Sequence, residues 1–455
     1  MSQLSDLAAG GTVRTVRLMA SLPDGRLIGK YISAIHLLEM LPSGPNVADI
    51  VFGLDVDNNP FVTAWSTWRG ELAELYLAPD MATLVVDPRT DGMATVICSF
   101  VLPDDSPIPE CPRGMVQRLL TQLADRGFTM RAGFEIEFNA FEESITEARG
   151  RGYRDLTPLG GDVRSMYSTT KSLSVVRFMD ALTRRLDQLG LHWESWMDEG
   201  GTGQFELNLE PDEALRTVDH ATLARLAIRE VAEEMGHCVT FMAKWHPTEW
   251  GGGLHCNHSL WVGDTSAFYD ESCHDNRSTT FHHWVGGLMA TMAGAQAVFA
   301  PNVNSYRRLV ELAGSPTTVT WSGDNKTTSL RAMARTPGSA RAEHRVPGAD
   351  SNLYLVMAVV LAGGMAGLDE VIEPPPPYAG MAWGLPAEDP MLPRSLMAAT
   401  EAFRSDHRLA AGLGAEFVDF WAGTRKWEWL AFHTTGGDPD SPLTDWELNR
   451  YFERV

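Results

Sequence analysis

The chain has 455 residues, more than one hydrophobic core usually fills, so we expect two domains. Its 59 acidic residues outnumber its 37 basic residues, which gives a net charge of -22, and no dense run of lysine and arginine occurs. A surface of this sign repels phosphate backbones and anionic membrane faces, so we expect neither a nucleic acid nor a membrane among its partners.

The segment from Thr12 to about Phe100 is typical of a small β-rich domain. Strand-like runs occur at 15–19 and 94–98, and turns are indicated at 23–25 and 57–60. The segment 103–112 is rich in proline and polar residues, which predicts a linker. We therefore expect one domain over residues 1–110 and a second over residues 111–455.

Beyond this linker, helices alternate with strands. Apolar periodicity predicts helices at 113–126, 174–189, 214–235, 281–299 and 352–368, and a strand at 239–244. The apolar run 353–368 is shorter than the roughly 20 residues that span a bilayer, so we expect a buried helix. A proline tract at 373–378 predicts a stiff spacer. The remainder, 392–455, is predicted to be helical, with core positions for Trp421, Trp427, Trp429 and Trp446.

Four short stretches carry charged or ligand-capable side chains at every second position, against apolar neighbours. They are residues 134–138, 204–207, 254–257 and 341–345. Because a β-strand sends alternate side chains to opposite faces, Glu135 and Glu137 would share one face while Phe134, Ile136 and Phe138 pack on the other. One such stretch is typical of an ordinary half-buried strand. Four together predict a single site for a metal and a nucleotide.

The cysteines and the N-terminus indicate the compartment. The five cysteines are odd in number, widely scattered and without a CxxC pair, which favours reduced thiols over a disulfide framework or a structural zinc site. The N-terminal segment lacks a basic start followed by a continuous apolar stretch, so no signal peptide is predicted. We therefore expect a cytoplasmic protein.

Six motifs follow one another along the chain. They are Glu135-Ile136-Glu137, Gly203-Gln204-Phe205-Glu206, Thr240-Phe241-Met242-Ala243-Lys244, Gly251-Gly252-Gly253-Leu254-His255, Asn304-Ser305-Tyr306-Arg307-Arg308-Leu309 and Arg341-Ala342-Glu343-His344-Arg345. In this order and spacing they resemble the glutamine synthetase family over nearly the whole chain. The ending Thr444-Asp445-Trp446-Glu447 is similar to that of the γ-glutamylamide synthetases, the glutamate–amine ligase branch that includes γ-glutamylpolyamine and γ-glutamylethanolamide synthetases.

The resemblance implies an α+β fold. It consists of a small N-terminal β-grasp-like domain and a large glutamine-synthetase-type catalytic domain, in which helices surround an antiparallel sheet. It also implies a homo-oligomer, a dodecamer of two hexameric rings, with each active site between neighbouring subunits.

The implied chemistry is ATP-dependent activation of the γ-carboxylate of L-glutamate to a γ-glutamyl phosphate, which ammonia or an amine then attacks. Both substrates arrive as anions, so two or more divalent ions, Mg²⁺ or Mn²⁺, would neutralise them. By the resemblance, one ion is held by Glu137, Glu199 and Glu206, and a second by Glu135, His255 and Glu343.

The same resemblance assigns the arginines. Arg308, beside Gly251, would bind the α-carboxylate of glutamate, and Arg345 would face the γ-carboxylate, because a planar guanidinium grips a carboxylate through two hydrogen bonds. Arg331, Arg341 and Arg345 would be catalytic, stabilising the transferred phosphoryl group. The residues implied in ATP binding are Asn257, Ser259, Lys326, Arg331 and Arg341.

The chain departs from ammonia-using synthetases where those carry a catalytic glutamate. That position is Gly314, which cannot take a proton from ammonium and should leave room for a bulkier amine. Gly314, Ser315 and Trp250 are therefore predicted to form an amine pocket. Glu311 could reach the site from a neighbouring turn, which keeps ammonia open as a substrate.

The leading hypothesis is a ligase that joins glutamate to a small amine. Two alternatives remain open: a glutamine synthetase that uses ammonia, and an inactive regulatory homologue in which Gly314, Trp250 and Lys326 reflect decay. The sequence does not identify the amine, and the candidates are ethanolamine, short alkylamines, polyamines and anilines.

Overall fold

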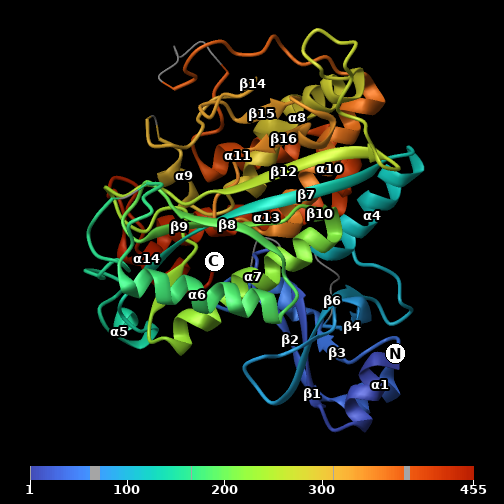
Figure 1. The fold of residues 1–455 in the computed structure, drawn as a ribbon, viewed down its shortest axis with the longest axis vertical. Helices are drawn as coiled ribbons and strands as arrows, with labels where there is room; N and C mark the ends of the chain where they lie inside the picture. The colour runs from blue at the N-terminus through green and yellow to red at the C-terminus, as the bar shows by residue number, and fades with distance from the viewer. Residues whose placement is uncertain (1, 62–71, 165, 311, 384–389) are drawn as a thin grey trace.

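The computed structural model describes residues 2–61, 72–164, 166–310, 312–383 and 390–455. Two β-sheets occupy successive parts of the chain (Figure 1). The N-terminal part, drawn in blue, forms a small lobe at one end of the molecule, and the large sheet with its helices makes up the rest. The predicted α+β class is confirmed.

The small sheet has six strands in the order β2-β1-β6-β4-β3, with β5 paired to β6. The adjacent strands β1 and β6 run parallel, and the other pairs are antiparallel. The predicted strands 15–19 and 94–98 lie inside β1 and β6. The elements are α1 (Ser2–Ala9), β1 (Val13–Ser21), β2 (Leu27–Ser33), α2 (Ala34–Met40), β3 (Asn46–Ala48), η1 (Asp49–Gly53), β4 (Glu74–Pro79), η2 (Met81–Thr83), β5 (Val85–Val86) and β6 (Gly92–Val101).

The large sheet has ten strands, with the central order β14-β15-β16-β12-β7-β9-β8. Every pair is antiparallel except β14 with β15. The four alternating stretches of the sequence lie in four neighbouring strands, β16, β12, β7 and β9. The strands are β7 (Thr129–Phe141), β8 (Trp193–Asp198), β9 (Gln204–Leu209), β10 (Asp212–Glu213), β11 (Cys238–Thr240), β12 (Leu254–Val262), β13 (Thr265–Ser266), β14 (Trp321–Ser322), β15 (Leu330–Met333) and β16 (Arg341–His344).

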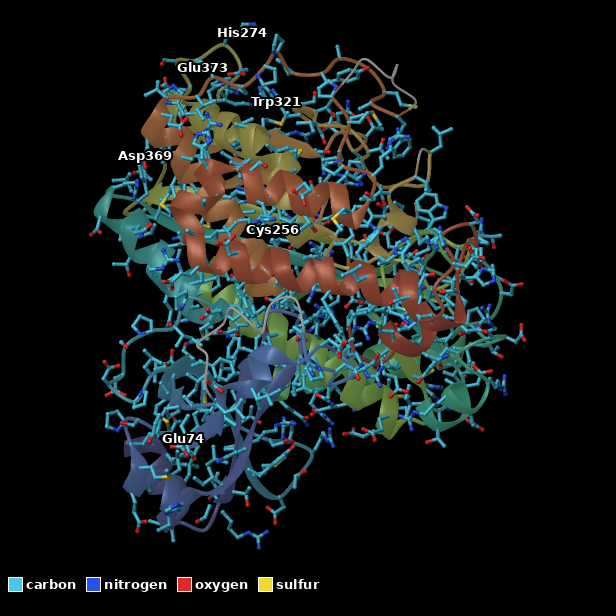
Figure 2. All side chains as sticks on the ribbon, turned by 180° about the vertical axis from the view of Figure 1, so that it is seen from behind. Glu74, Cys256, His274, Trp321, Asp369 and Glu373 are labelled. Atoms are coloured by element: carbon cyan, nitrogen blue, oxygen red, sulfur yellow. The ribbon has the colours of Figure 1, made fainter. Side chains whose placement is uncertain are left out.

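The helices cover the large sheet, and from behind the orange and red C-terminal helices lie across it (Figure 2). Several begin at a side chain that caps the first turn, such as Ser172, Ser278 and Asn352, each of which accepts a hydrogen bond from a main-chain N–H three residues on. They are α4 (Pro112–Asp125), α5 (Ile145–Gly150), α6 (Leu173–Gln188), α7 (Ala214–Glu234), α8 (Thr279–Phe299), α9 (Ser305–Arg308), η3 (Pro337–Ser339), α10 (Leu353–Glu370), α11 (Leu396–Ser405), α12 (His407–Leu413), α13 (Ala415–Thr434) and α14 (Asp445–Tyr451).

The predicted elements match these bounds closely, with one exception. The five predicted helices correspond to α4, α6, α7, α8 and α10. The predicted strand at 239–244 is too long, because β11 ends at Thr240 and residues 241–250 follow an irregular path. The domain boundary at residue 110 stays a prediction; β6 ends at Val101 and α4 begins at Pro112.

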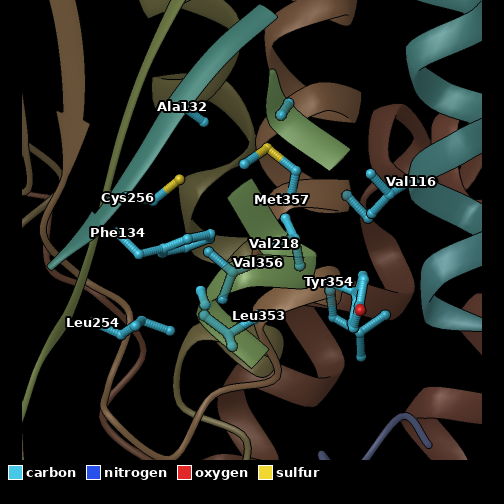
Figure 3. Close-up of a cluster of buried hydrophobic side chains, with 14 of the residues drawn as sticks. Val116, Ala132, Phe134, Val218, Leu254, Cys256, Leu353, Tyr354, Val356 and Met357 are labelled. Atoms are coloured by element: carbon cyan, nitrogen blue, oxygen red, sulfur yellow. The ribbon is translucent and has the colours of Figure 1, made fainter. Parts of the chain in front are cut away.

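The core lies between the large sheet and its helices. Phe134 of β7 is 1% exposed and faces Val356 of α10 (Figure 3). The even-numbered residues of β7 from Met130 to Ala140 are all buried, as the alternation predicts. Burial of side chains of this size contributes roughly 1.5–3 kcal/mol each. The apolar face of β7 is thereby fixed against the helices.

Helix α10 is the one helix in the described ranges that is long and apolar enough to cross a membrane by length and composition. Of the 18 residues of this helix, 78% are buried within the structure. It packs closely on α8, since a Cβ at Gly367 would lie 2.1 Å from the main-chain oxygen of His283. The prediction of a buried helix is confirmed.

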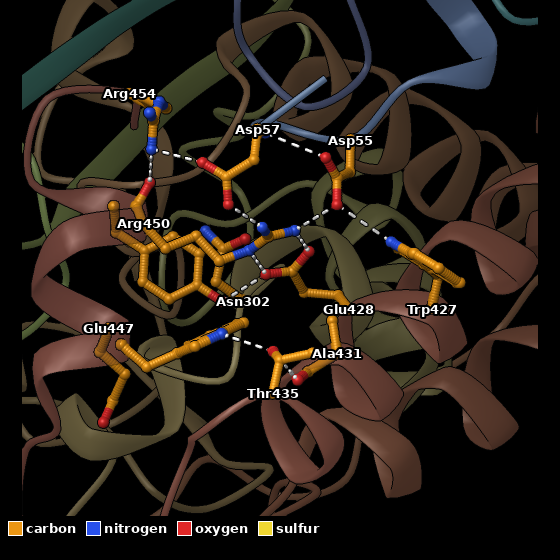
Figure 4. Close-up of polar contacts among 12 residues, drawn as sticks. Asp55, Asp57, Asn302, Trp427, Glu428, Ala431, Thr435, Glu447, Arg450 and Arg454 are labelled. Carbon is orange, nitrogen blue, oxygen red and sulfur yellow. Dashed lines mark hydrogen bonds and ion pairs between the residues drawn. The ribbon is translucent and has the colours of Figure 1, made fainter. Parts of the chain in front are cut away.

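A buried ionic cluster joins the N-terminal part to the C-terminal helices (Figure 4). Arg450 of α14 donates to Glu428 of α13 at 2.7 and 2.8 Å and to Asp55 at 2.9 Å. Asp55 also accepts a hydrogen bond from the indole of Trp427 at 3.0 Å. Of the four tryptophans predicted in the core, only Trp421 is fully buried, and Trp427 takes part in this cluster instead.

We expect Asp55→Asn to lower the free energy of unfolding by about 3 kcal/mol at neutral pH, because it removes one partner of a buried charge. Burial alone would raise the pKa of Asp55, but Arg450 and Trp427 hold it below its usual value. A carboxyl with a lowered folded-state pKa contributes stability above its unfolded value of about 4, and loses it as the pH falls. Urea unfolding should therefore show a weaker acid dependence below pH ~4 in the variant.

The exposed Asp91 provides the matched control. If Asp91→Asn and Asp55→Asn shift the urea midpoint equally, the cluster does not hold the two parts together.

Candidate active site

A cavity of about 380 Å³ opens on the face of the large sheet opposite the apolar core. Strands β7, β9, β12 and β16 supply its floor, and loops around residues 166–167, 250–251 and 313–315 supply its walls. The cavity therefore forms where the four alternating stretches meet.

The floor gathers carboxylates because the strand register aligns them. Glu137 of β7 is directly opposite Glu206 of β9, and Glu135 is opposite His255 of β12. Two sets of ligand atoms lie within 4.8 Å of one another: Glu135, His255 and Glu343, and Glu137, Glu206 and His255. The first set is the one implied for the second metal ion.

The second geometric set differs from the one implied for the first ion. His255 replaces Glu199, which lines the same cavity but lies outside the 4.8 Å group. Glu199 follows the end of β8, beside Gly200, and its main-chain N–H donates to the carbonyl of Gln204. His255 thus faces both groups, with Nδ1 2.7 Å from Glu135 and Nε2 3.8 Å from Glu137.

The electrostatics of this floor fit a divalent cation. Burial raises the pKa of Glu206 to about 9, and the charges of Glu135 and Glu137 add to the shift. Burial and the charge of Glu137 raise the pKa of Glu199 to about 8. Such shifts mark negative charge that lacks a counter-charge. Oxygen ligands with one imidazole suit Mg²⁺ or Mn²⁺.

On the opposite side of the floor, arginines compensate the negative charge of Glu343. Arg345 donates to Glu343 at 2.6 Å, and Arg331 donates to the other oxygen of the same carboxylate. Arg331 also pairs with Asp324. The cavity thus has an arginine-rich side at β15 and β16 and, at Glu199 and Glu206, a carboxylate side that is poorly compensated.

Arg308 lies under the loop of three glycines. It donates to the main-chain oxygens of Val346 at 2.8 Å and Arg345 at 3.3 Å, and its Nε has no partner in the described residues. A Cβ at Gly251 would lie 2.5 Å from Arg308 Cγ, and one at Gly253 would lie 2.8 Å from Glu137 Oε1. The glycines therefore let the loop approach both the arginine and the carboxylate.

Three of the residues implied in nucleotide binding lie beside the cavity rather than in its wall: Asn257, Ser259 and Arg341. Asn257 donates to Glu135 at 2.9 Å and accepts from Arg341 at 3.1 Å. Ser259, two residues further along β12, accepts from the indole of Trp261. His255, Asn257 and Ser259 alternate along the strand, so they form one polar strip that leaves the cavity. Lys326, by contrast, lines the cavity itself.

The predicted amine pocket has a different shape from the one expected. Trp250 packs between two glycines: a Cβ at Gly200 would lie 2.3 Å from its ring, and one at Gly314 would lie 3.0 Å away. The space beside Gly314 is therefore filled by an indole rather than open. Ser315 is buried and lines the cavity with both. Glu311 lies outside the described residues.

Several lining residues were not assigned a role from the sequence. Gln204 donates to Glu137 at 2.9 Å, and Asn208 donates to Glu206 at 3.1 Å. Both alternate with Glu206 along β9; the stretch 204–207 already includes Gln204, and extending it by one residue would have included Asn208. Met166, Tyr167 and Trp383 lie in irregular segments and have no such signal.

The family is established by comparison with known proteins. Residues 109–451 match the model of the glutamine synthetase catalytic domain. The chain belongs to the glutamine synthetase family, as predicted. A structure of GmaS in complex with ADP has the same fold, with a TM-score of 0.84 at 24% identity over 99% of both chains. An apo structure of GmaS superposes with a TM-score of 0.83 at 25% identity.

Named relatives include both amine ligases and glutamine synthetases. The γ-glutamylethanolamide synthetase GlnA4 of Streptomyces coelicolor is 32% identical, over 100% of this chain and 96% of its own length. The glutamate–isopropylamine ligase of a Pseudomonas species is 29% identical, over 100% of this chain and 98% of its own length. The glutamine synthetase of Thermotoga maritima is 31% identical, over 84% of this chain and 86% of its own length.

We expect Glu137→Gln to weaken Mn²⁺ binding at least tenfold, a loss of about 1.4 kcal/mol, because it removes one of the carboxylate ligands that the floor of the cavity brings together. Titration calorimetry measures the affinity, and circular dichroism checks that the fold persists. Glu142→Gln, just past the end of β7, is the matched control. Equal Mn²⁺ affinity in the two variants would show that these carboxylates do not hold the ion.

Proposed function

We propose that the protein ligates the γ-carboxylate of L-glutamate to a small amine with ATP. First, an oxygen of the γ-carboxylate of glutamate attacks the γ-phosphorus of ATP, and ADP leaves. The nitrogen of the amine then attacks the carbonyl carbon of the γ-glutamyl phosphate, phosphate leaves, and the nitrogen loses a proton. The observation that carries the proposal is the division of one cavity into an arginine-rich side and a carboxylate side that lacks counter-charge. The family and the named amine ligases support it.

On the arginine side, we assign the glutamate and phosphoryl groups. Arg308, with Gly251 above it, binds the α-carboxylate of glutamate. Arg345 and Arg331 both converge on Glu343, so their guanidinium groups already lie side by side. A transferred phosphoryl group placed there meets two cations in a cavity that restricts water, which strengthens each interaction.

On the strand side, we assign the nucleotide to the polar strip. Arg341, Asn257 and Ser259 lead away from the cavity along β12 and β16, and Lys326 lies within the cavity wall. Divalent ions held by Glu135, Glu137, Glu199, Glu206, His255 and Glu343 would supply charge neutralisation for the phosphates and the glutamate carboxylate. Hydrogen bonds from the protein keep three of these carboxylates oriented without the ions. Gln204 donates to Glu137, Asn208 to Glu206 and Asn257 to Glu135.

At the amine end, the walls are apolar and aromatic. Trp250, Met166, Tyr167 and Trp383 line the cavity, and the loop residues 312–315 contribute no carboxylate. Among the described lining residues, every acidic side chain belongs to the metal-binding floor. A second ammonium group of a polyamine therefore lacks an acidic partner among the described lining residues. We assign the acceptor to monoamines with an apolar or aromatic substituent.

We expect such a monoamine to exceed ammonium at least tenfold in kcat/KM. This difference needs only about 1.4 kcal/mol of transition-state discrimination, and burial contributes roughly 0.8 kcal/mol per methylene. Phosphate release at fixed glutamate and ATP, measured over ethanolamine, alkylamines, anilines, polyamines and ammonium, gives the ranking. A protein that is fastest with ammonium is a glutamine synthetase, and one that releases no phosphate with any acceptor is an inactive homologue.

Variants at Trp250 and Gly314 connect this ranking to the structure. Trp250→Ala should lower kcat/KM for the preferred amine about tenfold and leave the ammonium rate unchanged. Gly314→Glu alone is disfavoured, because Gly314 has φ +84° and a Cβ there meets Trp250. The pair Trp250→Asn with Gly314→Glu removes the contact with the indole, although the strain of the positive φ stays. We expect the pair to shift the preference towards ammonium.

We also expect a ring-shaped homo-oligomer, a dodecamer of two hexameric rings, as the family implies. Multi-angle light scattering on the full chain measures the mass of the assembly, and the amine-dependent rate is measured for each eluting species. An active monomer would contradict it.

A further inference from the structure

A hydrogen bond joins two side chains at the opening of the active-site cavity. Lys326 Nζ donates to the hydroxyl of Tyr167 at 3.3 Å, and both side chains line the cavity. Tyr167 is 57% exposed and Lys326 is also exposed, so the pair lies where the cavity meets solvent. Tyr167 comes from the connection between α5 and α6, and Lys326 from that between β14 and β15. We call this contact the Tyr167–Lys326 bridge.

The bridge holds the tyrosine by its hydroxyl group. The ammonium lies 5.8 Å from the centroid of the ring, near the limit for contact with an aromatic face, so the hydrogen bond is the main contact. Among the described residues, the hydroxyl of Tyr167 has no other hydrogen-bond partner, and Lys326 has no ion-pair partner. A lysine ammonium has three N–H donors, so two remain for a phosphate oxygen.

The main chain presents Tyr167 in a conformation that is costly for a bulky residue. Its φ is +58°, in the left-handed region that favours glycine. Its N–H donates to the carbonyl of Asp198 at 3.3 Å, and the carboxylate of Asp198 pairs with Lys171. The surroundings therefore impose this conformation, and such conformations cluster at sites where a side chain is needed in a particular place.

The segment that carries Tyr167 is also attached to the wall that Trp250 forms. Arg164 donates to the main-chain oxygen of Thr248 and to the carboxylate of Glu249, both at 3.1 Å. Trp250 follows directly in the chain. The two aromatic residues of the amine end therefore belong to segments that are tied together.

Lys326 belongs to a loop with bracing hydrogen bonds on both sides of the lysine. Asn325 donates to the main-chain oxygen of Gly380 at 2.7 Å, and the hydroxyl of Thr327 accepts from the N–H of Ala382 at 2.9 Å. The lysine thus has a fixed base, whereas the tyrosine ring is largely exposed. Loss of the bridge should therefore release the ring.

We propose that Lys326 is a positioning residue for the amine acceptor. Through the bridge, it holds the ring of Tyr167 over the amine end, where the ring contacts the apolar substituent of the acceptor beside the wall of Trp250. Loss of the bridge lets the ring leave the cavity and exposes that substituent to water. The proposal rests on the proposed ligase function and extends it, since one cation then serves both the nucleotide and the acceptor.

The test compares acceptors that share one acyl phosphate. Phosphate release by the natural chain and its variants is measured with ammonium and with the fastest of ethanolamine, isopropylamine and aniline. The result is expressed as the ratio of kcat/KM for the amine to kcat/KM for ammonium. A change in ATP or glutamate binding affects both reactions and cancels in this ratio, so the ratio reports on the acceptor alone.

We expect Tyr167→Phe to lower this ratio about fivefold, through a higher KM for the amine, because it removes only the hydroxyl that forms the bridge. Lys326→Met should lower the ratio equally, whatever its effect on the KM of ATP. Lys326→Arg keeps a cationic donor and should preserve most of the ratio. In the double variant Tyr167→Phe with Lys326→Met, the ratio should fall no further than in either single variant, because both changes break the same contact.

Arg335→Met is the matched control. Arg335 is exposed and pairs with Asp324 in the loop of Lys326, and it does not line the cavity, so its loss should leave the ratio unchanged. If Lys326→Met slows both acceptors equally, the lysine serves the nucleotide alone. If the losses of the two single variants multiply in the double variant, the residues act separately. Either result overturns the proposal.

The natural chain distinguishes this failure from failure of the proposed function. A natural chain that prefers the amine establishes the ligase, whichever way the variants behave. One that prefers ammonium, or that releases no phosphate with any acceptor, contradicts the ligase function, and the positioning role of Lys326 falls with it.

Discussion

The alternation of side chains along β7 is the constraint on which both the core and the cavity depend. Phe134 and Ile136 pack into the core, and this packing directs Glu135 and Glu137 to the opposite face. Because the period of a strand is two, a register shift of one residue would exchange the carboxylates for the apolar side chains of Phe134, Ile136 or Phe138. The apolar packing therefore selects the register, and the register aligns Glu137 with Glu206 across the strands.

Charge is distributed unevenly across the resulting cavity, and this distribution corresponds to the two halves of the proposed chemistry. Glu343 is compensated by Arg331 and Arg345, whereas Glu199 and Glu206 repel neighbouring carboxylates and have raised pKa values. An arginine pair suits a transferred anion, and an uncompensated carboxylate set suits a cation. The apolar core and the strand hydrogen bonds keep these carboxylates close together, despite their repulsion, before any ligand binds.

Sequence reasoning reached the elements and the floor of the site, but not its walls. Periodicity predicted the strand of Glu135 and Glu137 and most helix bounds, because a single strand or helix encodes its own period. Strand order is a long-range property, so periodicity alone could not show that β16, β12, β7 and β9 are neighbours. Glu199, Tyr167 and Trp383 lie in irregular segments, where no period exists. Only the family resemblance pointed to Glu199, and nothing in the sequence indicated the other two.

The wall at Gly314 shows why a substitution seen in sequence cannot be interpreted one position at a time. A glycine in place of glutamate was expected to leave room, yet Trp250 fills it and packs against Gly200 on its other side. A tryptophan needs both glycines, and a glutamate at position 314 needs the tryptophan to be absent. The three positions are therefore one packing unit, in which loss of the acidic side chain and gain of the aromatic wall occur together. In the proposed ligase, apolar contact with the acceptor and the loss of a carboxylate at position 314 then have a single structural cause.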